Sequence, residues 1–292
     1  MPENTSSPPV TRPMRVFLLG AGQRSEVVAE AERLRPIIEQ CAQIVCCDFS
    51  GSEDLSCLEA DLAIVLGGDG SILRAARQMG PRQIPVAAVN LGRLGFLANM
   101  LAEELPNVLR DFSEGRFSVI EHLMFECTVL RSGRILAKQL GLNEVAVQAG
   151  SPFNLIDIDL YVDSEPVTAY SCDGLIISTP VGSTAHSLSA GGPILRNSLQ
   201  AFVILPLSPH TLTMRPVVDS ADRVYEVVVE RPNPGTAVVV DGRLVCQMLP
   251  ADRVRVERAA ARFKLVAGRG HTYYRSLREK LGWSGRLKLD AK

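Results

Sequence analysis

Residues 62–78, LAIVLGGDGSILRAARQ, combine a strand, a turn and a helix in one short stretch. The apolar run Leu62–Leu66 predicts a buried strand, the glycines predict a turn, and Ser71–Gln78 predicts a helix. Asp69 is therefore expected on a glycine turn at the carboxyl end of a parallel strand, where open α/β sheets bind ligands. Glycine lets phosphate oxygens approach backbone amides, and a helix N-terminus favours anions. A tight turn with a capping aspartate explains GGDG alone about equally well.

The segments around this turn alternate between strand and helix. Strands are expected at Val16–Leu19, Ile44–Cys47 and Val86–Val89, and a helix at Glu26–Glu39. Apolar strands separated by helices indicate a parallel sheet with helices on its faces. We therefore expect an α/β domain over residues 14–120.

From about residue 120 the pattern changes to short strands separated by turns. A hairpin is expected around Arg131–Arg134, between strands at Phe125–Leu130 and Ile135–Leu140. Further strands are predicted at Leu155–Val162, Val224–Val229, Ala237–Val240, Val254–Val256 and Phe263–Val266, and a rigid connector at Pro206–Val218. This texture favours an all-β, β-sandwich-like domain over residues 121–270, with the ligand between the two domains. Tyr273–Leu289 returns to helical and mixed character.

Composition excludes several classes of protein. The net charge is −1, so no basic surface indicates binding to nucleic acid. The seven cysteines form no CxxC pair or Cys–His cluster, which indicates free thiols in a reducing compartment. The longest apolar runs, of about nine residues, are too short to span a membrane. The polar, proline-rich stretch at residues 1–13 predicts a disordered tail rather than a signal peptide, so a cytoplasmic protein is expected.

A second segment, DGLIISTPVGSTAHSLSAGGP at residues 173–193, is rich in glycine and hydroxyl side chains. An apolar run, Leu175–Ile177, leads into them. We expect a buried strand followed by a loop with exposed backbone and hydroxyls that bind a polar ligand. Ser183 is not in a GxSxG elbow and no base accompanies it, so a hydrolase triad is rejected.

The other motifs are weaker by themselves. GGDG lacks the lysine of the GxxxxGK[ST] phosphate loop. Gly20 and Gly22 follow the first strand and Asp48 ends the second, as in a dinucleotide fingerprint, but Ser25 stands where the third glycine belongs. The pair Asn143–Glu144 interrupts an apolar run, either as an exposed strand end or as partners of ribose hydroxyls.

Four histidines are scattered without metal-ligand spacing. Structural or surface roles are expected for His122, His210 and His271. His186 differs because it lies inside the hydroxyl-rich segment.

Read together, these segments resemble the NAD kinase family. The matching stretches are GGDG at 67–70, NE at 143–144, DGLIISTPVGSTAHSLSAGGPIL at 173–195, PHTLTMRP at 209–216, DGR at 241–243 and KLGW at 280–283. The likeness covers about residues 14–290 in the family's order. It implies a Rossmann-like α/β amino-terminal domain, a β-sandwich-like carboxyl-terminal domain with the site in the cleft, a segment 271–292 that returns to the first domain, and a homodimer or homotetramer.

The resemblance also implies a reaction and its residues. The γ-phosphoryl group of ATP moves to the adenosine ribose 2′-hydroxyl of NAD, with Mg²⁺ held mainly by the ATP phosphates. Asp69 matches the catalytic residue, which orients the hydroxyl and accepts its proton. Substrate contacts are implied for Gly67, Gly68, Gly70, Arg74, Asn143, Glu144, Asn154, Ser171, Asp173, Val181, Thr184, Ala185, His186, Ser187, Leu188, Ser189 and Arg243.

Several positions depart from the family pattern. His186 stands where relatives usually carry tyrosine, and Arg243 where they often carry glutamine. Ser71 and Val181 replace frequent threonines. Asn154 and Ser171 replace residues that are often basic.

Three alternatives remain beside NAD kinase activity. The first is a GGDG-type kinase with another acceptor, such as a lipid or a sugar phosphate. The second is a non-catalytic NAD(P)-binding regulator, and the third is a dehydrogenase built on Gly20 and Gly22. The NE pair and the GSTA segment disfavour the first, and the presence of Asp69 disfavours the second.

Overall fold

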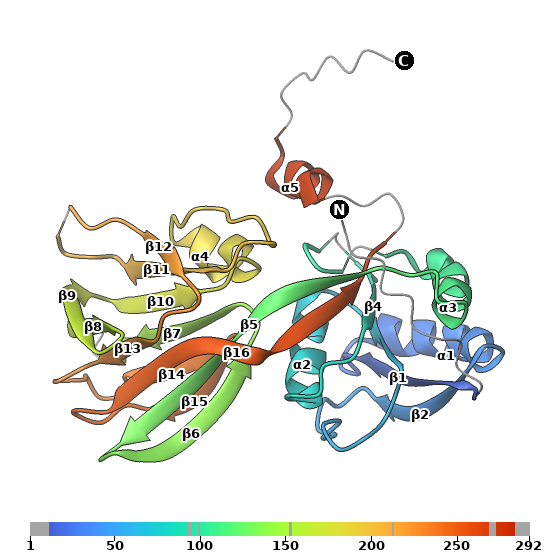
Figure 1. Ribbon diagram of the computed structural model, residues 1–292, viewed down its shortest axis with the longest axis horizontal. Coiled ribbons are helices and arrows are strands. Elements are labelled where there is room, and N and C mark those ends of the chain that lie inside the picture. Colours follow the sequence, from blue (N-terminus) through green and yellow to red (C-terminus); the bar gives the residue numbers. More distant parts are fainter. Residues whose placement is uncertain are drawn as a thin grey trace. The chain divides into compact units, whose positions relative to one another are not determined.

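The computed structural model of the protein describes residues 12–92, 95–98, 100–151, 154–211, 213–268 and 273–283 (Figure 1). The chain divides into two compact units. The first consists of Met1–Gln78, Ile84–Ile120 and Lys264–Lys292, and the second of Met79–Gln83 and Glu121–Phe263. Most of the predicted N-terminal tail, the predicted surface residue His271 and the chain beyond Trp283 lie outside the described residues.

The first unit contains a parallel sheet with the strand order β2-β1-β3-β4. Its strands are β1 (Met14–Gly20), β2 (Ala42–Asp48), β3 (Leu62–Leu66) and β4 (Val86–Val89). Its helices are α1 (Ser25–Glu39), α2 (Asp69–Met79), α3 (Leu105–Ser113) and α5 (Tyr273–Leu281), with the 3-10 turn η1 (Ala102–Glu104) before α3. The predicted α/β character is confirmed.

Burial in this unit follows from the sequence pattern. Every residue of β3 and β4 is buried, as expected for strands covered on both faces of a parallel sheet. Helix α1 buries Val27, Ala31, Leu34 and Ile38, which share one helical face and join the same apolar core. The turn that follows β3 therefore starts from a rigid, fully packed strand.

The second unit contains an antiparallel six-stranded sheet in the order β12-β11-β10-β7-β14-β15. These strands are β7 (Glu144–Gln148), β10 (Gly174–Ser178), β11 (Ala201–Leu207), β12 (Val217–Ser220), β14 (Ala237–Val240) and β15 (Arg243–Gln247). The other strands are β5 (Val119–Arg131), β6 (Arg134–Gly141), β8 (Ile156–Val162), β9 (Glu165–Cys172), β13 (Tyr225–Val228) and β16 (Arg253–Val266). Between β10 and β11 lie the short helical turns η2 (Gly182–Thr184) and α4 (His186–Ser189).

A single apolar core joins both groups of strands in the second unit. Leu175 and Ile177 of the six-stranded sheet belong to the same buried cluster as Ile158 of β8. The rings of Phe202 and Tyr225 meet edge to face, with centroids 5.7 Å apart. Two packed layers of strands are the β-sandwich-like arrangement that the sequence predicts.

Several strands are absent from the sequence-based prediction. One of them, β11, is mostly buried and lies inside its sheet, whereas three others lie at sheet edges. β9, β12 and β15 are end strands, and most of their residues are at least partly exposed. Without a buried face they show no clear alternation of apolar and polar residues. The predicted connector Pro206–Val218 is wrong at both ends, because Pro206 and Leu207 belong to strand β11 and Val217 and Val218 belong to strand β12.

The two strands predicted at Val254–Val256 and Phe263–Val266 are one strand, β16. The stretch ERAAAR between them carries no strand signal. Pairing with β5 and β13 holds β16 extended, so tertiary context overrides local propensity there.

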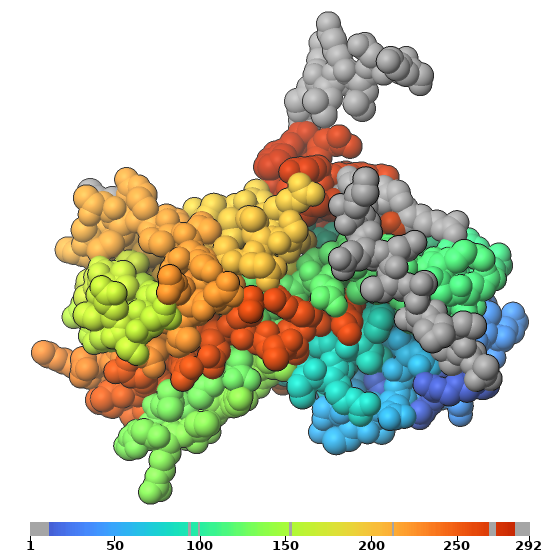
Figure 2. Space-filling view, in the orientation of Figure 1, coloured from blue at the N-terminus to red at the C-terminus, as the bar shows by residue number. Residues whose placement is uncertain are grey.

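The predicted hairpin at Arg131–Arg134 is present. Its central residues Ser132 and Gly133 have φ angles of 50° and 73°, as a two-residue hairpin turn requires. The tip stands out from the surface, in green, in Figure 2. Among the described residues, no helix has both the length and the apolar character needed to cross a membrane.

Candidate functional site

The turn after β3 is shaped by its first glycine. Gly67 donates its amide to the carbonyl of Val89 at 2.9 Å and has a φ of +134°, which favours glycine. A Cβ at Gly67 would lie 2.5 Å from Ser71 Oγ. In contrast, a Cβ at Gly68 or Gly70 would meet nothing within 4 Å. The turn is therefore tightly packed at its start and open around Asp69.

Asp69 is the first residue of helix α2, which begins earlier than the sequence predicts. Its Oδ2 accepts a hydrogen bond from the amide of Phe96 at 2.8 Å, and its Oδ1 accepts from the amides of Leu97 and Ala98, each at 3.0 Å. A Cβ at Gly95 would lie only 2.1 Å from Oδ1. Because a carboxylate offers about four acceptor sites, one remains for a further donor.

Arg74 lies on the same helix and reaches the loop after β2. Its Nη1 donates to the carbonyl of Ser50 at 3.3 Å. A Cβ at Gly51, whose φ is +76°, would lie 2.2 Å from Arg74 Cδ. The guanidinium is thus placed against this loop, and its contact with a phosphate stays a prediction.

Asp48, which the dinucleotide fingerprint would assign to a ribose, is engaged by the loop that follows it and by Gln78 of helix α2. Its carboxylate accepts hydrogen bonds from the amides of Ser50, Gly51 and Glu53, the Ser50 hydroxyl and Gln78 Nε2. Burial opposes the charge, but these hydrogen bonds outweigh it and lower the pKa of Asp48 to about 2.

The glycines of the fingerprint are also structural. A Cβ at Gly20 would lie 2.7 Å from Val27 Cγ1, and the Gly22 amide donates to the carbonyl of Phe49 at 2.8 Å. These close contacts account for both glycines without a ligand. Together with the engaged carboxylate of Asp48, they argue against the dehydrogenase alternative.

In the second unit, Asn143 and Glu144 lie at the start of strand β7. The carbonyl of Asn143 accepts hydrogen bonds from the Thr179 amide at 2.8 Å and the Ser178 hydroxyl at 3.3 Å. A Cβ at Gly182 would lie 2.1 Å from that carbonyl oxygen. The hydroxyl-rich segment therefore packs directly on the NE pair.

The carboxyl group of Glu144 is buried, with 7% of the residue exposed. Its Oε2 has no hydrogen-bond partner within the described part of the chain. Burial, and to a smaller extent the charge of Asp241, raise the pKa of Glu144 to about 8. Near neutral pH this carboxyl is therefore protonated, and it can donate as well as accept a hydrogen bond.

The expectation of exposed hydroxyls in residues 173–193 is wrong for most of them. Four hydroxyl residues of the segment have no exposed surface: Ser178, Thr179, Ser183 and Ser187. Ser183 Oγ donates to the carbonyl of Pro180 at 2.6 Å and accepts from the amide of Leu195 at 3.0 Å. Such hydroxyls satisfy backbone groups that the tight helical turns leave without partners. These internal hydrogen bonds stabilise the conformation of the segment.

Two predicted ligand contacts in this segment, Val181 and Ser187, are buried. Val181 is 4% exposed. Ser187 Oγ has no hydrogen-bond partner among the described residues, and a Cβ at Gly192 would lie 2.3 Å from it. Their contacts with a ligand stay predictions.

The remaining predicted residues are at least partly accessible. Half-buried or exposed are Thr184, Ala185, His186, Leu188 and Ser189 in η2, α4 and the link between them, together with Asn154, Ser171, Asp173 and Arg243. Atoms of the segment that holds η2 and α4 (yellow) are visible at the surface in Figure 2. Their contacts with a dinucleotide stay predictions.

One residue with a clear role at this site is absent from the sequence-based set. Asp241 accepts hydrogen bonds from the backbone amides of three successive residues, 142 to 144. The family resemblance assigns a role to Arg243 of the stretch DGR but none to Asp241. The dipeptide Asp-Gly is also a strong signal for a hairpin turn, which could have placed this residue.

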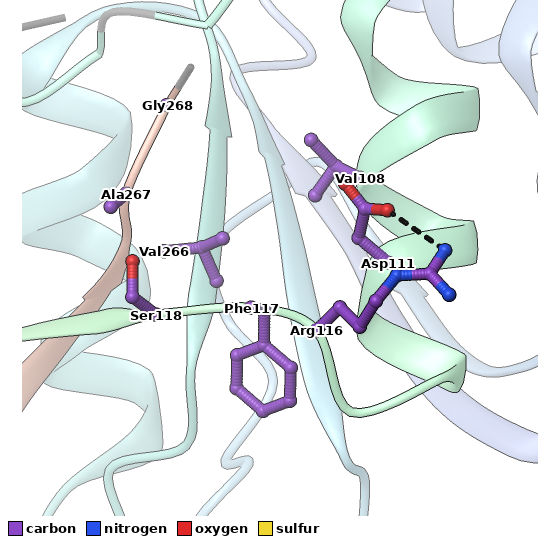
Figure 3. Close-up of a pocket in the computed structure, with 8 residues that line it drawn as sticks. All are labelled: Val108, Asp111, Arg116, Phe117, Ser118, Val266, Ala267 and Gly268. Atoms are coloured by element: carbon purple, nitrogen blue, oxygen red, sulfur yellow. Dashed lines mark hydrogen bonds and ion pairs between the residues drawn. The ribbon is translucent and has the colours of Figure 1, made fainter. Parts of the chain in front are cut away.

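A concavity of about 360 Å³ lies in the first unit, between α3 and the end of β16 (Figure 3). It is lined by Val108, Asp111, Arg116, Phe117, Ser118, Val266, Ala267 and Gly268. Arg116 donates to Asp111 at 3.5 Å and also pairs with Glu114, so its charge is already compensated. None of the predicted site residues borders this concavity.

Within the described ranges, no three side chains of the types His, Cys, Asp and Glu come together as a metal site. The carboxylate of Asp69 is largely occupied by amides.

The strand-turn-helix that carries GGDG and the two-unit fold together define a class of protein. This class is the nucleotide-binding kinases of the GGDG type. Residues 48–117 match the family described as ATP-NAD kinase N-terminal domain, and residues 142–268 match ATP-NAD kinase C-terminal domain. The chain is 53% identical over 278 residues to the NAD kinase of Rhodopirellula baltica, covering 95% of this chain and 89% of the relative. It is 40% identical over 269 residues to that of Geobacter sulfurreducens, covering 91% and 94%. The chain belongs to the NAD kinase family, and the resemblance seen in its motifs is confirmed.

Solved structures agree with this assignment. An NAD kinase from Archaeoglobus fulgidus in complex with ATP has a TM-score of 0.73 and 27% identity, covering 93% of this chain and 100% of that one. Yeast NADH kinase complexed with NADH has a TM-score of 0.82 at 22% identity, covering 96% of this chain and 91% of that one, and shows the shared fold.

Proposed function

We propose that the protein is an NAD kinase, which transfers the γ-phosphoryl group of ATP to the adenosine ribose 2′-hydroxyl of NAD and releases ADP and NADP. Membership of the family supports the reaction class. The single observation that carries the proposal is the carboxylate of Asp69, fixed by three amides beside an open glycine turn with one acceptor site left.

Asp69 acts on the accepting hydroxyl. Phosphoryl transfer depends on positioning and on stabilising charge. The 2′-hydroxyl donates a hydrogen bond to Asp69, its oxygen forms the new bond to the γ-phosphorus, and the bond from that phosphorus to the β,γ-bridging oxygen breaks. The hydroxyl proton leaves toward the carboxylate. Because aspartate is a weak base at neutral pH, orientation of the hydroxyl is the larger part of this role.

The phosphates meet the glycine turn. The open surroundings of Gly68 and Gly70 let phosphate oxygens approach the backbone there, and the first turn of α2 favours negative charge. Arg74 on the same helix offsets part of that charge. Mg²⁺ prefers oxygen ligands and keeps several waters, so the ATP phosphates hold it.

The dinucleotide contacts the second unit. Asn143 and Glu144 hold a ribose and its neighbouring phosphates, with the neutral carboxyl of Glu144 as a donor. The nicotinamide and adenine ends meet residues of 173–189, with Asn154, Ser171 and Arg243 as further contacts. His186 stacks on a base in place of the family's usual tyrosine. Val181 and Ser187 are proposed as further contacts, although both are buried.

We also propose the location of the enzyme, its assembly state and its domain bounds. We place the enzyme in the cytoplasm, as a homodimer or homotetramer without nucleic acid or membrane partners. The α/β domain spans residues 14–120, the NAD-binding domain residues 121–270, and the segment 271–292 returns to the first domain.

The direct test offers the purified protein NAD, ATP and MgCl₂ and separates the nucleotides by chromatography. NADP, identified by a phosphorus resonance coupled to the 2′ position, is the expected product. Parallel reactions offer a diacylglycerol or fructose 6-phosphate in place of NAD. Transfer to either of these, with none to NAD, contradicts the proposal.

A further inference from the structure

The hairpin between β14 and β15 turns on two residues, Asp241 and Gly242. Their φ angles are +47° and +75°. Both positive values are typical of a type I′ turn, for which Asp-Gly and Asn-Gly are the preferred dipeptides. Backbone geometry therefore explains an aspartate or an asparagine here, but not which of the two is needed.

The side chain of Asp241 makes contacts that the hairpin itself does not require. Its Oδ2 accepts the amide of Leu142 at 2.8 Å, and its Oδ1 accepts the amides of Asn143 at 2.8 Å and Glu144 at 3.1 Å. In return, the Asp241 amide donates to the carbonyl of Glu144 at 3.0 Å. One carboxylate thus binds three consecutive amides in the residues that lead into β7. Hydrogen bonds to an ionised acceptor are about twice as strong as neutral ones.

The carbonyls of Leu142 and Asn143 are bound by another residue, Thr179. Thr179 Oγ1 donates to the carbonyl of Leu142 at 2.6 Å, and the Thr179 amide donates to the carbonyl of Asn143 at 2.8 Å. With its three amides bound by the Asp241 carboxylate and two of its carbonyls by Thr179, this backbone has little freedom.

We propose that Asp241 is a positioning residue for the dinucleotide, which fixes the backbone of residues 142–144 so that Asn143 and Glu144 face the ligand in one arrangement before it binds. The inference rests on the proposed function only in naming the ligand. The contacts between Asp241 and the three amides are independent of it.

The charge of Asp241 has a second effect. Glu144 is buried, with Oε2 unpartnered in the described part of the chain, and Asp241 is the charged group that acts on it. On the neighbouring strands, β10 places Ser178 opposite Glu144, and β14 places Val240 opposite Val145. These neighbours bring no compensating charge. A second negative charge beside Asp241 is disfavoured, so the site presents a neutral acid that can donate to a ribose oxygen.

The substitution Asp241→Asn separates this role from the hairpin. Asparagine keeps the turn, since Asn-Gly suits type I′, but its amide NH₂ cannot accept the hydrogen bonds that one carboxylate oxygen receives. The matched control is Asp163→Asn. Asp163 and Ser164 form the β8–β9 turn with φ angles of 50° and 68°, and Asp163 Oδ1 accepts the amide of Val224 at 2.9 Å.

Hydrogen exchange measured by NMR reports how well the backbone amides are protected when no nucleotide is present. In Asp241→Asn we expect exchange at the amides of Leu142, Asn143 and Glu144 to accelerate by about tenfold or more. In Asp163→Asn the amides of residues 142–144 stay protected. The ¹³C resonance of the Glu144 carboxyl titrates at lower pH in Asp241→Asn than in wild type. Unchanged protection at residues 142–144 overturns the inference.

A measurement on the wild-type protein tests the inference even if Asp241→Asn fails to fold. As the pH falls and Asp241 takes a proton, the amide resonances of Leu142, Asn143 and Glu144 shift with one shared midpoint, which matches the Asp241 carboxyl carbon. Three unrelated midpoints overturn the inference.

Calorimetry with NAD alone tests whether fixing the backbone of residues 142–144 affects the affinity for NAD. The Kd for NAD rises by about tenfold or more in Asp241→Asn and is unchanged in Asp163→Asn. If wild type binds NAD and Asp241→Asn binds it equally well, the positioning role is wrong while the proposed function stands. Wild type that binds no NAD contradicts the proposed function itself, whatever the amides show.

Discussion

The carboxylate of Asp69 accepts a hydrogen bond from the backbone amide of Phe96, with 2.8 Å between Oδ2 and the nitrogen. Two further amides, of Leu97 and Ala98, bind Oδ1. The residue proposed for catalysis therefore also holds residues 95–98 in place. Its orientation is set by backbone groups before any substrate binds, which is the preorganisation that an accurate acceptor of the 2′-hydroxyl requires.

Gly95 tests this preorganisation. A Cβ at Gly95 would lie 2.1 Å from Asp69 Oδ1, so Gly95→Ala must displace the carboxylate. A displacement of about 1 Å costs on the order of 100-fold in rate. We expect kcat for NADP formation to fall by about this factor. Gly92→Ala is the control because its Cβ would meet nothing within 4 Å. Equal kcat values for the two variants would show that the position of Asp69 is unimportant.

Glu144 gives a pH-dependent stability. Its pKa is raised to about 8 from the ordinary 4.5, so the folded state holds the proton more tightly than the unfolded chain. This contribution is fully present below pH 4.5 and is lost as the pH rises through 8. In Glu144→Gln the dependence disappears. Relative to wild type, the variant should gain free energy of unfolding, on the order of 3 kcal/mol, between pH 5 and pH 8.5. Urea unfolding at both pH values measures it, and parallel curves would refute the buried neutral acid.

Two buried serines in one segment should respond oppositely to loss of the hydroxyl. Ser183 Oγ both donates to the carbonyl of Pro180 and accepts from the amide of Leu195, so Ser183→Ala removes two buried hydrogen bonds. It should cost about 1–3 kcal/mol of unfolding free energy. Ser187 Oγ has no partner among the described residues, so Ser187→Ala should be neutral or stabilising. Urea denaturation of both variants measures the two changes in the free energy of unfolding. A loss in Ser187→Ala as large as in Ser183→Ala would mean that its hydroxyl has a partner.

His122 should make the protein sensitive to acid. It is 2% exposed, stacks near Phe263 with centroids 6.2 Å apart, and burial lowers its pKa from 6.5 to about 4. The folded state resists protonation, so stability is present above pH 6.5 and is lost as the pH falls toward 4. His122→Leu should therefore gain stability relative to wild type from pH 7 to pH 4.5, measured by thermal unfolding. The exposed His210, substituted in the same way, should show no such gain. If it gains as much, the buried imidazole is not the cause.

The sequence predicted many of the elements in which burial leaves a pattern, although the buried strand β11 was missed. The runs of β3 and β4 and the apolar face of α1 were sufficient to place the parallel sheet. Edge strands such as β9 and β15 were missed because they have no buried face to impose alternation. The long strand β16 was divided because its middle is extended only through pairing.

At the site, side-chain chemistry was predictable and its partners were not. GGDG pointed to Asp69, but the amides of residues 96–98 that hold it are backbone groups and carry no signal in the sequence. Hydroxyls in residues 173–193 were expected to face a ligand, yet Ser183 turns inward to satisfy local backbone groups. The long-range contact between Asp241 and the NE pair depends on strand pairing between β14 and β7. Only the folded chain reveals it.

The most direct test of the central claim measures NADP formation and NAD binding side by side for wild type and Asp69→Asn. NADP is detected with an NADP-specific dehydrogenase in the presence of ATP and MgCl₂, and NAD binding by calorimetry without ATP. We predict NADP formation by wild type, a loss of kcat by a factor on the order of 1,000 in Asp69→Asn, and nearly unchanged Kd for NAD in that variant. Equal loss of binding and turnover would contradict the assigned role of Asp69. Folded wild-type protein that binds NAD but forms no NADP would contradict the kinase itself.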